Sequence, residues 1–263
     1  MNALPTLFIS HGAPPFALEP GEAGALLQEL GRSLPAMQSV LVISPHWMTR
    51  GFSVMTTEKP ETVPDFDGFD PRLNHVRYPA RGHRALALAT AALLESHGHA
   101  VRLDAQRGYD HGTWIPMLHL LPQAQTPIFQ LSMPHTLTPT QAFELGRLLQ
   151  PLSEQGVLIV GSGSITHNLY EFSLDGHGEA PYVKAFMNWV RDKALQGDVN
   201  ALIHAVIDAR TQAPHAARAH PTDEHYLPFL IALGAARTTA KPQLLDGGIT
   251  YGVIGMDSYF WRP

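Results

Sequence analysis

The stretch VLVISPHW at residues 40–47 joins a buried strand to a histidine that stands just beyond its end. Val40–Ile43 is a short apolar, β-branched run, which is typical of a fully buried strand in a parallel sheet. Ser44 and Pro45 end the strand, and His46 follows. In open α/β sheets, ligands bind outside the carboxyl ends of the strands. We therefore expect His46 to lie at a ligand-binding edge of a sheet.

Two further segments repeat this design. The apolar run 7–9 leads into Ser10-His11-Gly12, and the apolar run Val157–Val160 leads through the turn-like GSGS of residues 161–164 to His167. If all three strands belong to one parallel sheet, they bring three imidazoles around one crevice.

The rest of the chain alternates between short apolar runs and segments with apolar residues at helical spacing. Strands are expected at Leu4–Ser10, Ser39–Ser44, Phe52–Thr56, Val101–Asp104, Pro127–Ser132 and Val157–Val160. Helices are expected at Glu22–Ser33, Arg81–Gly98, Ile115–Leu121, Pro139–Gln155, Tyr182–Leu195, Val199–Ile207 and Pro228–Ala236, and a hairpin at Leu244–Trp261 is expected to close the sheet edge. The sequence predicts an α/β fold: one domain over residues 1–263, with a mostly parallel central sheet flanked by helices and a metal site at the carboxyl ends of the strands.

Composition excludes several classes of function. The net charge is −5 and no long basic run occurs, so we expect no nucleic-acid partner. No apolar stretch approaches the roughly 20 residues that span a bilayer, and the N-terminus lacks the charged start of a signal peptide. Cysteine is absent, which rules out disulfides and thiolate metal sites and favours a cytoplasmic location.

Histidine is abundant, with 15 residues, and with cysteine absent the strong transition-metal ligands left are imidazole and carboxylate. Five histidines stand out as candidates for a metal or catalytic site: His11 and His46 after strands, His111 and His167 in turn-like segments, and His225 at the start of a helix. There the helix dipole favours the neutral imidazole that a metal requires. His220 is five residues from His225, too far round a helix to share its face, so only one of them is expected to be a ligand.

Seven further histidines in helical or polar contexts are expected to be surface or satisfied core residues and not ligands: His75, His83, His97, His99, His177, His204 and His215. The segment Glu58–Pro79, which contains PDFDGFDP at 64–71, is long enough for a functional loop. It is either a lid over the crevice or a surface loop without a function.

Four common catalytic or binding motifs are missing. The chain has no HExxH of zinc proteases, and the glycine-rich GSGS segment lacks both the third glycine of a dinucleotide-binding turn, where Thr166 stands, and a P-loop lysine. It also lacks the GxSxG turn that carries the nucleophile of serine hydrolases.

Five motifs together resemble the class III extradiol ring-cleavage dioxygenases, and in particular their DOPA 4,5-dioxygenase-like branch. They are SHGAP at 10–14, SPHW at 44–47, YDHGTWIPM at 109–117, GSGSITHNL at 161–169 and HPTDEHYLPFL at 220–230. They occur in the family's order and span nearly the whole chain. The resemblance implies a single α/β domain, in agreement with the strand pattern.

The resemblance also implies a role for each of the five histidines. His11, His46 and His225 match the metal ligands, His167 matches the acid–base residue, which in zinc-loaded members lies close enough to be a fourth ligand, and His111 matches a residue that donates a hydrogen bond to bound oxygen. The protocatechuate-type relatives use a glutamate as third ligand, whereas here His225 takes that place with Glu224 beside it.

The expected reaction is extradiol cleavage of a small, DOPA-like catechol by dioxygen, with both oxygen atoms inserted to give a ring-opened semialdehyde. One divalent metal ion is expected, Fe(II) for the reaction, although three neutral histidines suit Zn(II) at least as well. The alternative is a zinc-binding protein or zinc hydrolase on the same scaffold, without oxygen chemistry.

Overall fold

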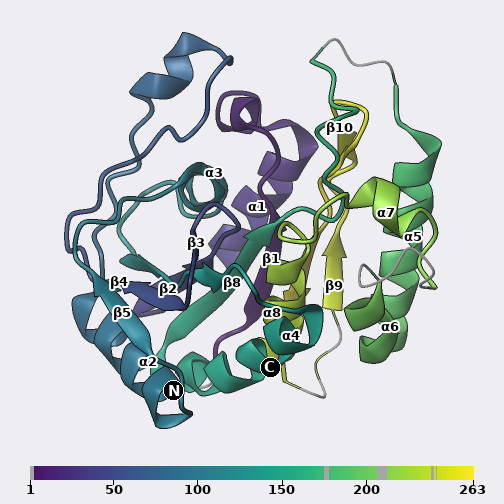
Figure 1. Ribbon diagram of the computed structural model, residues 1–263. Helices are drawn as coiled ribbons and strands as arrows, with labels where there is room; N and C mark the ends of the chain where they lie inside the picture. The colour runs from purple at the N-terminus through teal and green to yellow at the C-terminus, as the bar shows by residue number, and fades with distance from the viewer. Residues whose placement is uncertain (1–2, 175–177, 206–211, 238–239, 241) are drawn as a thin grey trace.

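The computed structural model describes the chain except for residues 1–2, 175–177, 206–211, 238–239 and 241 (Figure 1). Its centre is a six-stranded sheet with the strand order β6-β2-β8-β1-β12-β9. The first four are mutually parallel: β6 (Ile128–Gln130), β2 (Ser39–Ile43), β8 (Val157–Gly163) and β1 (Thr6–Ser10). The predicted α/β fold with a mostly parallel sheet is confirmed.

The predicted C-terminal hairpin also forms and closes one edge of the sheet. Strand β12 (Ser258–Trp261) pairs antiparallel with β1, and β9 (Pro242–Leu245) pairs antiparallel with β12. Three small two-stranded pairs lie outside the main sheet: β3 (Met48–Thr49) with β7 (Met133–Pro134), β4 (Phe52–Met55) with β5 (Val101–Asp104), and β10 (Ile249–Thr250) with β11 (Ile254–Gly255).

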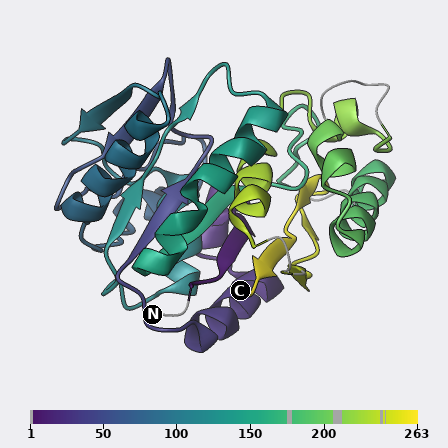
Figure 2. The same cartoon turned by 90° about the horizontal axis from the view of Figure 1, so that it is seen from below.

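Helices cover both faces of the sheet, which lies between α1 on one side and α4 and α8 on the other (Figure 2). The α-helices are α1 (Gly21–Ser33), α2 (Arg84–Ser96), α3 (His111–Leu120), α4 (Pro139–Leu149), α5 (Pro181–Gln196), α6 (Val199–His204), α7 (Ala216–Ala219) and α8 (Leu227–Ala235). The last residues of the predicted helix Val199–Ile207 lie outside the described part of the chain. None of the described helices combines the length and apolar character needed to cross a membrane.

Strand β8 is longer than predicted, because the glycine-rich segment at residues 161–163 continues the strand and does not form a turn. Gly161 and Gly163 are needed for packing against the α8 region. A Cβ atom on Gly161 would collide with the backbone oxygen of Pro228, and one on Gly163 with the backbone oxygen of His225. The two glycines thus let the chain around α8 lie directly on the strand.

Helices α3 and α4 differ most from their predicted bounds. Helix α3 begins at His111, earlier than Ile115, because the Asp110 side chain caps it by accepting a hydrogen bond from the Thr113 N–H. His111 is therefore helical, and the turn predicted for it was wrong. Helix α4 ends at Leu149 and continues as a 3₁₀ helix to Gln155, because a proline at 151 cannot donate the α-helical hydrogen bond.

Candidate metal centre

Five imidazole rings converge at the carboxyl ends of the parallel strands. The ring centroids of His11 and His46 are 5.0 Å apart, and that of His225 lies 5.5 Å from the first and 5.2 Å from the second. His111 lies 3.8 Å from His46, and His167 stacks on His225 at 3.5 Å with the ring planes 8° apart. All five candidate histidines from the sequence therefore meet in one cluster, which we call the histidine cluster.

Each ring is placed there by the element that precedes or follows it. His11 directly follows β1, His46 follows β2 after a short turn, and His167 follows β8. His111 is the first residue of α3, and His225 lies just before α8. The strand-end argument thus accounts for three of the rings, and helix starts supply the other two.

The His11 ring is buried, with 1% of the residue exposed, and its tautomer is fixed by the neighbouring strand. Its Nδ1 lies 3.0 Å from the hydroxyl of Ser162 on β8, and that hydroxyl donates its own hydrogen to the backbone oxygen of Gly112. The hydroxyl can therefore only accept from His11, so Nδ1 carries the hydrogen. The Nε2 of His11 is left with a lone pair, as a metal ligand requires.

His225 is held in the same tautomer by a carboxylate. Its Nδ1 lies 3.0 Å from Oε1 of Glu224, which as a carboxylate only accepts hydrogen bonds. Its Nε2 is buried and has no hydrogen-bond partner within the described part of the chain. A buried ring nitrogen without a partner is costly unless something binds it. Glu224 orients His225 in the way that carboxylates orient metal-binding histidines.

The Nε2 atoms of His11 and His46 face each other at 3.2 Å. Two nitrogens that each lie about 2.1 Å from one metal ion would be roughly 3.0–3.4 Å apart at bond angles between tetrahedral and octahedral values. The pair therefore fits two ligands of one ion. Within the described residues, two sets of nearby ligand atoms could hold a metal ion: His11, His46 and His111, and His167, Glu224 and His225.

Burial keeps these rings neutral. Loss of solvation, together with the nearby histidines, lowers the pKa of His11 and of His225 well below the ordinary value. Burial is also the main cause that lowers the pKa of His46 and of His167 to about 4. Neutral imidazole is the form that binds a metal, so these four rings are in the ligand form at neutral pH.

The segment that carries His167 is attached by hydrogen bonds to the segment that leads to His225. The backbone N–H of His167 donates to the oxygen of Ala219 at 2.9 Å, and that of Ser164 donates to the oxygen of His225 at 2.9 Å. His220 adds a third bond, with Nε2 2.6 Å from the oxygen of Ile165. Of the two neighbouring histidines, His225 joins the cluster, and His220 supports the His167 segment.

The long segment Glu58–Pro79 contacts the cluster at His111. Asp65 accepts hydrogen bonds from both the backbone N–H and Nδ1 of His111, at 2.8 and 3.0 Å. The ring of Phe66 lies edge-on to that of His111, with centroids 5.6 Å apart. The segment thus reaches the site.

A buried aspartate, Asp110, holds residues around His46 in place through hydrogen bonds. Its role was not predicted from the sequence. Its two carboxylate oxygens accept hydrogen bonds from Ser44 at 2.9 Å, from Arg107 at 2.8 Å and from Gln130 at 2.6 Å. Arg107 also donates to the backbone oxygen of His46 at 3.2 Å. The sequence signal for Asp110 was its place as a helix cap, three residues before Thr113.

The histidines that were expected not to be ligands do not belong to either ligand set among the described residues. His83 instead caps α2 by accepting a hydrogen bond from the N–H of Leu86, and His204 lies within hydrogen-bond distance of a backbone oxygen of its own helix. His177 lies outside the described residues.

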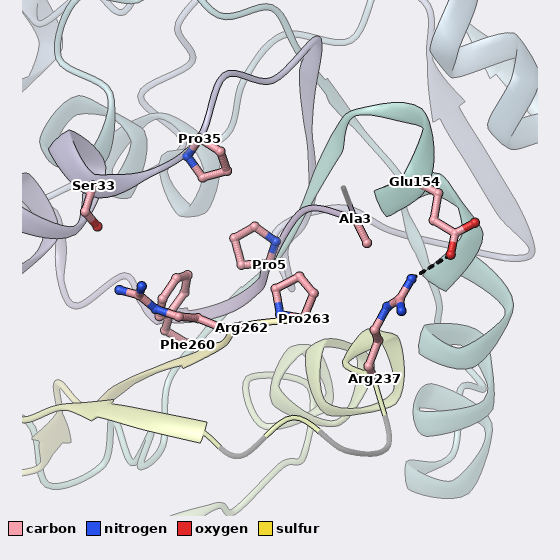
Figure 3. Close-up of a pocket in the computed structure, with 9 residues that line it drawn as sticks. All are labelled: Ala3, Pro5, Ser33, Pro35, Glu154, Arg237, Phe260, Arg262 and Pro263. Atoms are coloured by element: carbon pink, nitrogen blue, oxygen red, sulfur yellow. Dashed lines mark hydrogen bonds and ion pairs between the residues drawn. The ribbon is translucent and has the colours of Figure 1, made fainter. Parts of the chain in front are cut away.

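A separate cavity of about 700 Å³ opens at the other end of the sheet (Figure 3). Ala3 and Pro5, which precede β1, line it together with Pro263, and Arg237 forms an ion pair with Glu154 across 2.7 Å at its edge. Because His11 follows β1 and Pro5 precedes it, this cavity and the histidine cluster lie at opposite ends of that strand. The cavity therefore has no part in the site.

Comparison with known proteins identifies the family. A family model described as the catalytic LigB subunit of aromatic ring-opening dioxygenase matches residues 6–260. The chain belongs to the LigB family. It is 36% identical to a 4,5-DOPA dioxygenase extradiol of Beta vulgaris over 98% of this chain and 96% of that one. A protein of the same name from Escherichia coli (strain K12) is also 36% identical, over 96% of this chain and 93% of its own length.

A solved structure supports the same assignment for the fold. The crystal structure of an uncharacterized protein from Escherichia coli K12 superimposes with a TM-score of 0.81 at 31% sequence identity, and it covers 98% of this LigB-family chain and 99% of its own. The chain is thus an extradiol aromatic ring-opening dioxygenase, as the resemblance implied.

Proposed function

We propose that this LigB-family enzyme binds one divalent metal ion through His11, His46 and His225 and cleaves a small catechol of the DOPA type with dioxygen. The substrate class is carried over from the names of the relatives, 4,5-DOPA dioxygenase extradiol. In this assignment His167 is the acid–base residue, and His111 contacts the reacting groups.

The observation that carries the metal assignment is the pattern of hydrogen bonds at Nδ1. The Ser162 hydroxyl and the Glu224 carboxylate each take up the Nδ1 hydrogen of one ring, which leaves the Nε2 lone pairs of His11 and His225 for a ligand. The buried Nε2 of His225 has no partner among the described residues. When bound, the metal would supply a charge that acidifies the catechol hydroxyls and a place for dioxygen beside them.

His167 is suited to move a proton because its ring is neutral and stacks on the ring of the proposed ligand His225. Its low pKa, caused mainly by burial, leaves a lone pair on the ring at neutral pH. The proton of a catechol hydroxyl can pass to this imidazole and return later to the product. The hydrogen bond between the His167 N–H and the Ala219 oxygen fixes the backbone from which the ring acts.

Fe(II) is the metal that we assign to the reaction, because zinc has no redox chemistry with which to activate dioxygen. Three neutral nitrogen ligands nevertheless bind Zn(II) more tightly than Fe(II) in the usual order of affinities. This donor set is the observation that favours the second candidate function, a zinc protein without oxygen chemistry.

Oxygen uptake decides between the two functions. Metal-free protein is reconstituted anaerobically with Fe(II) or, as a control, with Zn(II), and each sample is then tested with a panel of catechols. We expect oxygen consumption and a yellow ring-opened product in the iron sample alone. Absence of uptake with every catechol, at one bound iron per chain, would contradict the proposal and leave the zinc protein as the better description.

A further inference from the structure

The His111–Asp65 pair brings together two residues 46 positions apart in the sequence. Asp65 accepts two hydrogen bonds from the same residue, from the His111 backbone N–H at 2.8 Å and from its Nδ1 at 3.0 Å. Its side chain is 27% exposed, so the carboxylate is partly shielded from water. Burial alone would raise the pKa of Asp65, but the hydrogen bonds that it accepts from His111 lower it overall.

The segment that carries Asp65 is itself fixed to α3. The indole N–H of Trp114 donates to the backbone oxygen of Val63 at 3.0 Å, and the N–H of Val63 donates to the oxygen of Tyr109 at 2.8 Å. The ring of Phe66 then packs against both His111 and Trp114, at centroid distances of 5.6 and 6.3 Å. Asp65 is therefore held in place on both sides along the chain.

An ionised carboxylate can accept hydrogen bonds but cannot donate them. The hydrogen between Asp65 and His111 must then reside on Nδ1 of the histidine, so that in the neutral form of the ring the lone pair is on Nε2. One ligand atom of His111 lies within 4.8 Å of one atom each of His11 and His46. Since Nδ1 is engaged by Asp65, Nε2 is the atom available to face the cluster.

We propose that Asp65 is a positioning residue that fixes His111 in the tautomer with hydrogen on Nδ1 and presents its Nε2 lone pair to the substrate. This inference rests on the proposed function only for its catalytic consequence: His111 accepts a hydrogen bond from a catechol hydroxyl, in contrast to the donor role expected from the resemblance. The tautomer itself is a property of the protein that needs no turnover to be measured.

Nitrogen NMR of the histidine rings tests the tautomer directly. The full chain is labelled with ¹⁵N-histidine and loaded with Zn(II), which is diamagnetic, and the His111 signals are identified by their loss in His111→Gln. We expect protonated Nδ1 and unprotonated Nε2 in the wild type and in the control Asp67→Asn, which removes a carboxylate from the same segment. Asp67 has no hydrogen bond or ion pair to a described residue.

Asp65→Ala removes the acceptor, so the His111 ring should lose its single tautomer and populate the form with hydrogen on Nε2. Asp65→Asn keeps the shape of the side chain, which protects the fold, but its amide can accept or donate and should also mix the tautomers. A wild-type His111 with hydrogen on Nε2, or an unchanged ring in both variants, would overturn the proposal.

Kinetics of the Fe(II)-loaded enzyme then separate positioning from metal binding. We expect kcat of Asp65→Ala to fall about 10–100-fold, the usual cost of losing a residue that orients a histidine, with KM for the catechol and the iron content unchanged. Asp65→Glu should recover part of the rate. Loss of iron from Asp65→Ala would instead make His111 a ligand and refute the role stated here. An inactive wild type that shows the expected tautomer would refute only the proposed function.

Discussion

At the residue scale, the proposed function assigns different roles to the stacked pair His167 and His225, and substitution should separate them. His225→Ala removes a ring whose Nε2 is buried without a partner among the described residues, so we expect metal content to fall well below one per chain. His167→Ala should retain the metal and lose at least 10²-fold in kcat, the usual contribution of a positioned acid–base group. Metal analysis and oxygen uptake on the same samples check both results, and metal loss from His167→Ala would make His167 a ligand.

The sequence could predict these histidines but not the residues that orient them. A histidine after a buried strand is a local pattern. The five histidines of the cluster were found through local patterns of this kind or through the family motifs. Ser162 lies 151 positions from the His11 that it orients, and Asp65 lies 46 positions from His111. No local pattern encodes such pairs, because each depends on which strand ends and loops the fold brings together.

At the element scale, the junction between β8 and α8 depends on glycine. In Gly163→Ala the new methyl group would collide with the backbone oxygen of His225 and lie 3.2 Å from the ring of Phe8. We expect a loss of about 1–3 kcal/mol in the free energy of unfolding, as for other overpacked sites, together with weaker metal binding, because His225 must move. Gly51→Ala is the matched control, since a Cβ there meets no atom within 4 Å. Urea unfolding and metal titration of both variants provide the measurement, and equal behaviour would contradict this account.

This junction also explains why the strand was predicted too short. Glycine and serine at residues 161–164 have the composition of a turn, and sequence patterns give glycine that meaning by default. Here the glycines lie in a strand because backbone atoms of another segment approach closely, which is the other common reason for glycine in a sheet. The approaching segment begins more than sixty residues later, so the sequence around β8 does not reveal it.

At the scale of the whole molecule, a buried ion pair connects α5 to the residue just before the C-terminal strand β12. Arg191 holds Asp257 through two hydrogen bonds of 2.7 Å, and the Asp257 side chain is 0% exposed. Arg191→Met leaves that carboxylate buried and unpaired, which should cost about 3–5 kcal/mol. Arg147→Met breaks the exposed pair with Glu144 and should cost no more than about 1 kcal/mol. Thermal unfolding of the two variants compares them, and similar losses would contradict the argument.

The buried histidines should make the stability of the metal-free protein depend on pH. Burial lowers the pKa of His220 from 6.5 to about 4, and that of His46 and His167 similarly. Between these values the unfolded chain binds more protons than the folded one, so stability falls as the pH drops from about 6.5 towards 4. For His220 alone the loss is about 3 kcal/mol. Urea unfolding at several pH values should show that the free energy of unfolding depends less steeply on pH in His220→Gln than in the wild type. An equal dependence in both proteins would exclude His220 as a source of this pH effect.

The wide spacing of the histidines along the chain has a consequence for biosynthesis. The ribosome releases His11 and His46 well before His225, which lies 179 residues beyond His46 in a chain made at roughly 5–20 residues per second. β1 also waits for β8 and β12, its two neighbours in the sheet. A nascent chain therefore cannot close the three-histidine site that we propose. A metal ion can therefore be bound by all three proposed ligands only after this later segment has joined the sheet.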